Sequence, residues 1–164
     1  MILNLKKAFA QENYREAFQF SLDLSDVEFD GVYPFSQPIA ITAKLKNSAG
    51  VVTLNIFGEA CYEAPCDRCA TNCSERIVVD NEYILATEVE NEDNDNILLV
   101  TENELNLAEL SRTDVLLQIP MKHLCSPDCK GLCSVCGTNL NKDTCSCDKK
   151  QIDPRLAALA ELLK

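Results

Sequence analysis

The sequence has little of what enzymes and membrane proteins need. One histidine occurs in 164 residues. No Ser-His-Asp spacing suited to a nucleophilic triad is present, and no glycine-rich loop suited to phosphate binding. No apolar run approaches the roughly 18 residues that span a bilayer. These absences argue against an enzyme and against an integral membrane protein, and we expect no catalytic residues.

The first residues also lack the basic start and long apolar stretch of a secretory signal peptide. We therefore expect a cytoplasmic protein. Internal repeats and low-complexity tracts are absent as well. With 46% apolar and 25% charged residues, the composition is that of a soluble globular protein with a real core. Its length fits one domain, or one domain with a small appended module.

Positive charge is scarce, and the acidic excess is unevenly distributed. The chain has 26 acidic and 15 basic residues, a formal net charge of -11. Residues 61–120 hold 14 acidic and 3 basic residues, whereas residues 121–164 hold 5 and 7. Because an acidic surface repels phosphate groups, the charge favours a basic protein as the partner. The acidic segment 88–96 is predicted to be a solvated loop or, alternatively, a contact surface for that partner.

Alternating apolar residues predict a mainly antiparallel β-sheet in the first half of the chain. The period of two residues predicts strands at about 16–24, 39–46, 51–61 and 75–87. Turn-forming residues at 47–50 favour a hairpin between the two middle strands. The expected fold class is α+β, with a mainly antiparallel β-sheet domain. The pattern does not decide whether this sheet closes into a barrel.

Two helices are predicted in the second half. Asn106, followed three positions later by an acidic residue, is a typical N-cap and predicts a helix near 106–118. Asp153 and Pro154 predict the start of a last helix near 154–163. The predicted organisation is therefore a β-rich domain at 1–120, a cysteine-rich zinc module at 121–150 and a C-terminal helix at 151–164.

Cysteine is abundant, with 10 residues in the chain. In a reducing compartment this favours metal binding or thiol chemistry over disulfides. The pairs Cys66/Cys69 and Cys133/Cys136 have the spacing at which a tight turn presents two thiolates to one ion. Glycine directly after Cys136 permits the positive φ that such a turn needs. We therefore predict tetrahedral thiolate sites, with zinc as the expected ion.

The spacing leaves two ligand arrangements open. The favoured arrangement has two zinc ions, held by Cys66, Cys69, Cys125 and Cys129, and by Cys133, Cys136, Cys145 and Cys147. The other arrangement has one site, formed by Cys66, Cys69, Cys133 and Cys136. We favour two sites because a single site leaves too many thiols without a partner.

Three further residues could belong to these sites or to the core. Cys61 is predicted to be a small buried apolar side chain on its strand. Cys73 is either the same or an exchanged ligand. His123 lies two residues before Cys125 and could replace one thiolate.

Two other functions suit a cysteine-rich chain. One is a thiol-based redox switch at Cys145 and Cys147. The other is electron transfer through an iron-thiolate site, which usually shows two Cys-x-x-Cys-Gly turns, and here only Cys136 precedes glycine. A zinc-dependent binding module or assembly factor remains the favoured class.

Taken together, these features resemble the YceD family of large ribosomal RNA subunit accumulation proteins. The matching segments are residues 66–69, the tail 124–141 and the closing segment 153–159. The resemblance implies a role in the accumulation or processing of large-subunit (23S) rRNA, without an assigned catalytic activity. It also implies that the first cysteine pair joins Cys125 and Cys129, because some members keep that pair and lack the later cysteine-rich extension.

The resemblance also suggests partners, since the family's genes often lie beside that of a small, basic large-subunit ribosomal protein. We expect this ribosomal protein, large-subunit rRNA or both to be bound, and neither a membrane nor a small-molecule substrate. Basic residues that could meet phosphates, or that could be scattered solubility charges, are Arg68, Lys122, Lys130, Lys142, Lys149, Lys150 and Arg155. No Phe, Tyr or Trp lies between 122 and 164, so base stacking on the tail is hardly available.

Overall fold

The structure is a computed structural model that describes residues 1–88 and 96–147. It divides into two compact units. Unit 1 comprises Met1–Ala64 with Ser74–Met121, and unit 2 comprises Pro65–Cys73 with Lys122–Lys164. The predicted terminal helix 154–163 and most of the acidic segment 88–96 lie outside the described residues. The predicted division at 120 and 150 stays a prediction.

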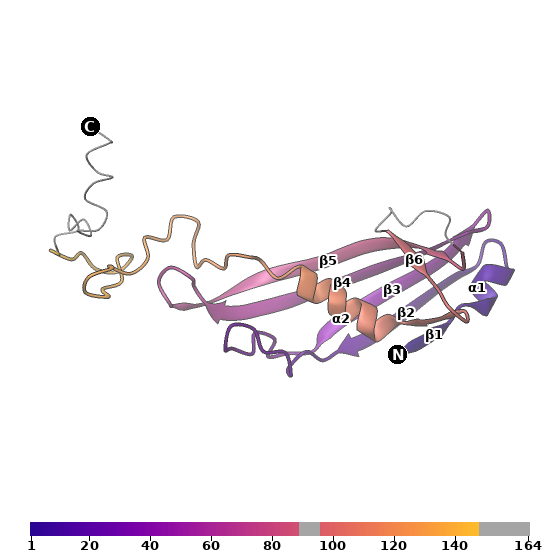
Figure 1. The fold of residues 1–164 in the computed structure, drawn as a ribbon, viewed down its shortest axis with the longest axis horizontal. Helices are drawn as coiled ribbons and strands as arrows, with labels where there is room; N and C mark the ends of the chain where they lie inside the picture. The colour runs from indigo at the N-terminus through magenta and orange to yellow at the C-terminus, as the bar shows by residue number, and fades with distance from the viewer. Residues whose placement is uncertain (89–95, 148–164) are drawn as a thin grey trace, which may run out of the picture. The chain divides into compact units, whose positions relative to one another are not determined.

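Unit 1 is built on a five-stranded sheet in the order β2-β3-β4-β5-β6 (Figure 1). Its strands are β2 (Arg15–Leu22), β3 (Ile39–Ser48), β4 (Val51–Pro65), β5 (Asn72–Ala86) and β6 (Ile97–Leu99). The four predicted strands are confirmed. Strand β3 is antiparallel to β2 and to β4, but β6 adds to β5 in parallel, so the sheet is mixed. In the part of the chain described, β2 and β6 are free edges and the sheet does not close into a barrel.

Four smaller elements complete unit 1. They are β1 (Ile2–Asn4), α1 (Lys6–Ala10), β7 (Glu104–Asn106) and α2 (Leu107–Leu117). Strands β1 and β7 form a separate antiparallel pair. Helix α2 begins as predicted, because the Asn106 side chain accepts a hydrogen bond from the Glu109 N–H at 3.3 Å. None of the helices found in residues 1–88 and 96–147 is long and apolar enough to cross a membrane.

The predicted hairpin forms between β3 and β4. Its two turn residues, Ala49 and Gly50, both have positive φ, 53° and 85°, as tight hairpin turns require. Asn47 is buried beside the turn, where its side chain donates to the Ala8 carbonyl at 2.7 Å and accepts from the Gly50 N–H at 3.1 Å. These bonds hold the register that places alternate residues on opposite faces of the sheet.

One face of the sheet is buried and the other is open. Side chains of β3 and β4 alternate between the two faces, and Ile41, Leu54 and Ile56 are less than 2% exposed. Helix α2 covers this buried face (Figure 1). Tyr83 of β5 donates a hydrogen bond to Asp114 of α2. No helix or strand of the described residues covers the opposite face, which we call the open face.

Candidate metal centre

The first Cys-x-x-Cys pair lies in the connection from β4 to β5, within unit 2. The Cys66 N–H donates to the Thr71 carbonyl at 2.9 Å, and the Ala70 N–H donates to the Cys66 carbonyl at 2.8 Å. Ala70 has φ of 54°, a conformation that residues other than glycine seldom adopt. The resulting tight turn carries Cys66 and Cys69 at neighbouring positions of one loop.

The second Cys-x-x-Cys pair makes the same turn. The Cys133 N–H donates to the Thr138 carbonyl at 2.8 Å, and the Gly137 N–H donates to the Cys133 carbonyl at 2.9 Å. Gly137 has φ of 73°, as its place after Cys136 predicted. The six-residue turn thus occurs twice in unit 2, once with glycine and once with alanine at its left-handed position.

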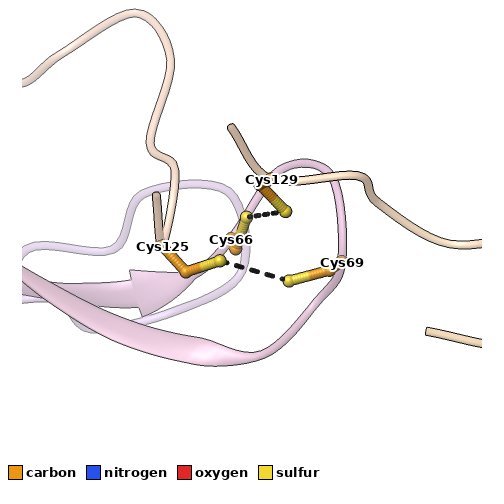
Figure 2. Close-up of side chains that lie close together, drawn as sticks. All are labelled: Cys66, Cys69, Cys125 and Cys129. Carbon is orange, nitrogen blue, oxygen red and sulfur yellow. Dashed lines mark hydrogen bonds between the residues drawn. The ribbon is translucent and has the colours of Figure 1, made fainter. Parts of the chain in front are cut away.

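Four sulfur atoms converge at the first turn, and we call this set the first cluster: Cys66, Cys69, Cys125 and Cys129 (Figure 2). All four Sγ atoms lie within 4.8 Å of one another. The Sγ atoms of Cys66 and Cys129 are 3.8 Å apart, and those of Cys69 and Cys125 are 3.6 Å apart. Four sulfurs placed tetrahedrally about 2.3 Å from one ion lie roughly 3.8 Å from each other. The first cluster therefore has the dimensions of a tetrathiolate metal site.

The second cluster consists of Cys133, Cys136, Cys145 and Cys147, whose Sγ atoms also lie within 4.8 Å of one another. Of these, Cys133 is buried and Cys136 is exposed. The structure thus brings together the eight predicted cysteines in the two sets that we favoured. It does not group Cys66 and Cys69 with Cys133 and Cys136. That these residues hold metal stays a proposal.

The backbone N–H groups around each turn favour the thiolate form of its first cysteine. Burial opposes ionisation of Cys66, but backbone N–H groups, led by that of Cys125, lower the pKa of its thiol to about 6. Backbone N–H groups of Cys136 and Val135 likewise lower the pKa of the Cys133 thiol to about 6. The thiolate is the form that binds metal. Each turn therefore supplies one cysteine whose thiol ionises readily at neutral pH.

In each cluster, one cysteine from outside the turn behaves in the opposite way. Hydrogen bonding to Cys69 and then to Cys129 raises the pKa of the Cys125 thiol to about 12. Hydrogen bonding to Cys136 raises the pKa of the Cys147 thiol to about 12. In each cluster the negative charge already present resists a further thiolate, and a bound cation would remove that resistance.

Hydrogen bonds join the tail to the first turn. The backbone N–H of Asp67 donates to the His123 carbonyl at 2.9 Å. In return, the backbone N–H of His123 donates to the Asp67 carboxylate at 2.7 Å. The Arg68 guanidinium donates to the Cys129 carbonyl at 2.8 Å. These contacts hold the segment that carries Cys125 and Cys129 against the first turn.

The loop of the second cluster also contacts the first. The Leu132 N–H donates to the Arg68 carbonyl at 3.0 Å. The Asn141 amide donates to the Cys129 Sγ at 3.2 Å, the kind of outer contact that orients a metal ligand. Gly131 has φ of 77°, and a Cβ atom there would lie 3.0 Å from the Arg68 carbonyl oxygen. The sequence reasoning missed Asn141 because nothing in the cysteine spacing marks it.

The remaining cysteines lie outside both clusters. Cys61 is exposed, so the prediction that it is buried was wrong. It alternates with buried Ala60 and Tyr62 on β4 and therefore points to the other side of the strand. Cys73 lies half-buried, with its Sγ 3.1 Å from Nε2 of buried His123. In the structure His123 thus contacts Cys73 and is not a member of either cluster.

The basic residues predicted around the cysteines fall into three groups. Lys122, Lys130 and Lys142 are exposed. Arg68 is exposed as a residue, while its guanidinium bonds the Cys129 carbonyl. The others, Lys149, Lys150 and Arg155, lie outside the described residues.

Fold and site together define a class: a small β-sheet protein with two tetracysteine clusters that could each hold a metal ion. The chain belongs to the YceD family, described as "Large ribosomal RNA subunit accumulation protein YceD", whose model matches residues 54–163. The match includes all eight clustered cysteines, and it confirms the resemblance found in the sequence.

Relatives match a limited part of the chain. A protein of Arabidopsis thaliana named "Large ribosomal RNA subunit accumulation protein YCED homolog 1, chloroplastic" is 36% identical over 59 residues, 36% of this chain and 18% of that protein. Its namesake from Zea mays is 35% identical over 52 residues, 31% of this chain and 18% of that protein. An uncharacterised protein of Mycobacterium tuberculosis is 35% identical over 74 residues, 45% of this chain and 35% of that protein. The chain thus spans about a fifth to a third of these relatives' lengths. No solved structure gives a significant match.

Proposed function

We propose that this protein is a zinc-stabilised, non-enzymatic factor that promotes the accumulation of large-subunit rRNA during ribosome assembly. The observation that carries the proposal is the pair of tetracysteine clusters in a chain of a family described by that role. The plant relatives carry the same description in their names. We place its action in the cytoplasm, on the 23S rRNA.

Zinc is the ion that suits this donor set best. Four cysteine ligands are typical of closed, structural zinc sites, in which no coordination position remains for water or substrate. Sites of this kind would supply folding free energy rather than chemistry, in keeping with a binding factor. Four thiolates around one dication would leave each cluster with a net charge of about -2, which adds to the acidity of the chain.

The metal part of the proposal is tested by native mass spectrometry and absorbance of the purified protein. We expect two zinc ions per chain and a colourless solution. A coloured, iron-containing protein would contradict zinc and would favour the iron-thiolate alternative. One ion that persists in Cys125→Ser would contradict the assignment of the first cluster.

Acidic charge suggests how a ribosomal partner is bound. Residues 61–120 carry 14 acidic and 3 basic residues, which would attract a basic ribosomal protein not yet covered by RNA. We propose that the segment 88–96 takes part in this contact. Nascent large-subunit rRNA is the second partner, bound together with that protein or by itself.

Depletion of the protein in the cells that produce it tests the assembly role. We expect the ratio of large-subunit to small-subunit rRNA to fall, and to recover when the wild-type gene is restored. An unchanged ratio would show that the assembly role is wrong. Recovery of the ratio by a Cys66→Ser/Cys133→Ser double variant would show that the clusters are dispensable for the role.

A pull-down from lysate, with and without nuclease, separates the two partners. Neutralising the five acids of segment 88–96 to their amides should weaken capture of a basic ribosomal protein and flatten its salt dependence. The variant replaces Glu88, Glu90, Glu92, Asp93 and Asp95. A control with the same charge change replaces five exposed acids elsewhere: Glu12, Asp30, Glu82, Glu102 and Glu104. Equal capture by both variants would mean that the segment is only a solvated connection.

A further inference from the structure

The open face of the sheet carries three cations at one corner. Arg15 on β2 lies directly opposite Lys46 on β3, and Lys44 lies opposite Ala17, two positions along the same strands. All three cations are exposed, and none forms an ion pair with a described residue. Together with Glu16, Ala17 and Leu45 they line a depression of about 450 Å³, which we call the basic depression.

This arrangement is unfavourable for the sheet by itself. Like charges placed directly opposite each other on neighbouring strands destabilise the pairing. No carboxylate of the described chain lies within ion-pair distance of Arg15, Lys44 or Lys46. A chain with a net charge of -11 nevertheless places three of its 15 basic residues here. A bound anion would remove the repulsion.

An exposed aromatic ring lies on the same face. Phe57 on β4 pairs with Thr42 on β3, and Thr42 is two residues from Lys44, so all three side chains point to the open face. A diagonal neighbour of this kind lies about 7–8 Å away. Phe57 is 40% exposed, although burial in the core would stabilise such a side chain. Its ring is thus available to a ligand that also reaches the cations.

A single-stranded nucleic-acid site needs two elements, cations and an exposed aromatic ring. The open face of the sheet carries both. The cations follow the phosphates, and the ring stacks on a base that pairing has not hidden. An acidic protein segment would use the cations but would gain little from the ring. A duplex would offer phosphates but keeps its bases stacked inside.

We propose that the open face at β2–β4 binds single-stranded RNA, with Arg15, Lys44 and Lys46 on phosphates and Phe57 stacked on a base. This inference rests on the proposed function and names the surface that contacts RNA. It moves the RNA contact from the cysteine-rich tail, which has no Phe, Tyr or Trp in residues 122–164, to the sheet.

Acidic residues limit the site on its far side. On β5, Asp80 and Glu82 are exposed, and Asp80 accepts a hydrogen bond from Asn55 of β4 at 3.1 Å. Also on β4, Glu59 is paired with Arg76 of β5. Repulsion from these carboxylates would confine the RNA to β2, β3 and the near part of β4.

Fluorescence anisotropy of the full chain with a short labelled oligouridylate tests the proposal. The triple variant Arg15→Gln/Lys44→Gln/Lys46→Gln should weaken binding about tenfold or more at low salt. The slope of log affinity against log salt should fall by about 2, since each phosphate contact on a single strand contributes roughly 0.7. Phe57→Leu, which keeps an apolar side chain, should weaken binding about fivefold or more without changing the slope.

A matched control removes three exposed cations from the tail: Lys122→Gln/Lys130→Gln/Lys142→Gln. We expect this control to bind the oligouridylate within about twofold of the wild type, since exposed charges that make no contact with the RNA act only through a screened field. Circular dichroism and thermal unfolding check that each variant is folded. Unlabelled duplex RNA and polyglutamate serve as competitors and should displace the probe poorly.

Four results would overturn the proposal. They are wild-type affinity in the basic-depression triple variant, loss of binding in the tail control instead, an unchanged affinity in Phe57→Leu, and efficient displacement by polyglutamate. The last would identify an acidic protein segment as the occupant. None of these results affects the depletion experiment, so the assembly role can stand when the RNA surface fails. An unchanged rRNA ratio would refute the role even if the face binds RNA.

Discussion

The two cysteine clusters of unit 2 share a turn but differ in how they are completed. In both, a Cys-x-x-Cys turn with a left-handed fifth residue and a threonine at its end makes the same two backbone hydrogen bonds. The first cluster takes its other pair from 56 and 63 residues away in sequence. The second cluster is contained within residues 133–147. The same local unit thus serves a long-range link in one case and a local loop in the other.

Burial follows this difference. In the first cluster, three of the four cysteines are buried, namely Cys66, Cys69 and Cys129, whereas in the second only Cys133 is. A buried thiolate without a cation is costly, so loss of metal should disturb the first cluster more. The comparison therefore predicts unequal consequences for equivalent substitutions in the two turns.

The largest effect is expected for Cys66→Ser. With zinc bound, this change should remove one of two ions and much of the roughly 10 kcal/mol that a structural zinc site supplies. Hydrogen exchange should rise over residues 66–71 and 122–129, while native mass spectrometry reports one ion. Cys61→Ser, at an exposed cysteine outside both clusters, is the control and should keep two ions. Retention of both ions by Cys66→Ser would contradict the prediction.

A smaller effect is expected for Cys136→Ser, at the second cysteine of the second turn, which corresponds to Cys69 of the first. It should also remove one ion, but faster hydrogen exchange should be confined to residues 133–147. The first cluster should keep its ion, with its affinity lowered by about tenfold at most through the contact from Asn141. Equal loss of protection at residues 66–71 would show that the two clusters form one cooperative site.

The contact between the clusters can be removed by itself. Asn141→Ala deletes the donor that lies 3.2 Å from the Cys129 Sγ, and should lower the metal affinity of the first cluster about 10- to 100-fold. Competition with a chelator measures the change. Lys142→Ala, at the next exposed position, is the control and should match the wild type. An unchanged affinity in Asn141→Ala would mean that the second loop does not support the first site.

The smallest effects are expected at the fifth residue of each turn, and their signs should differ. Ala70→Gly should stabilise unit 2 by about 0.5–1 kcal/mol, because Ala70 has φ of 54°. Gly137→Ala should destabilise it by about 1–2 kcal/mol through φ alone, since no heavy atom beyond its chain neighbours lies within 4 Å of the added Cβ. Thermal unfolding of the metal-loaded protein measures both.

A control for this pair uses an alanine in ordinary strand geometry. Ala40→Gly on β3 should be destabilising, because glycine loses more backbone entropy on folding. If Ala70→Gly has the same sign as Ala40→Gly, the left-handed conformation of Ala70 is not under strain.

The sequence predicted the long strands well, because a period of two residues persists over β2 to β5. It did not predict β1 or β7, since three residues carry no readable period. Residues 97–100 were visible as an apolar run, but the parallel pairing of β6 with β5 depends on distant residues. The same alternation that identified β4 places Cys61 on the exposed side, and applying it would have avoided the wrong prediction.

The site was predictable to the extent that its chemistry is local. Spacing identified both turns, and glycine after Cys136 indicated the left-handed residue. The left-handed conformation of Ala70 was not predicted, because alanine in a sequence does not indicate a positive φ. Which pairs share a cluster could not be decided from spacing, and the favoured grouping drew on the resemblance as well. The basic depression was missed because Arg15 and Lys46 become neighbours only through the register of β2 and β3.

The long-range closure of the first cluster has a consequence for the timing of synthesis. Its second pair begins 56 residues after Cys69, which at a translation rate of about 5–20 residues per second corresponds to a delay of roughly 3–11 s. During that interval Cys66 and Cys69 form only half a site. A chain that stops before Cys125 would never complete it. Metal capture at this cluster would therefore report that translation has passed residue 129, and would do so before the cysteines of the second cluster are all made.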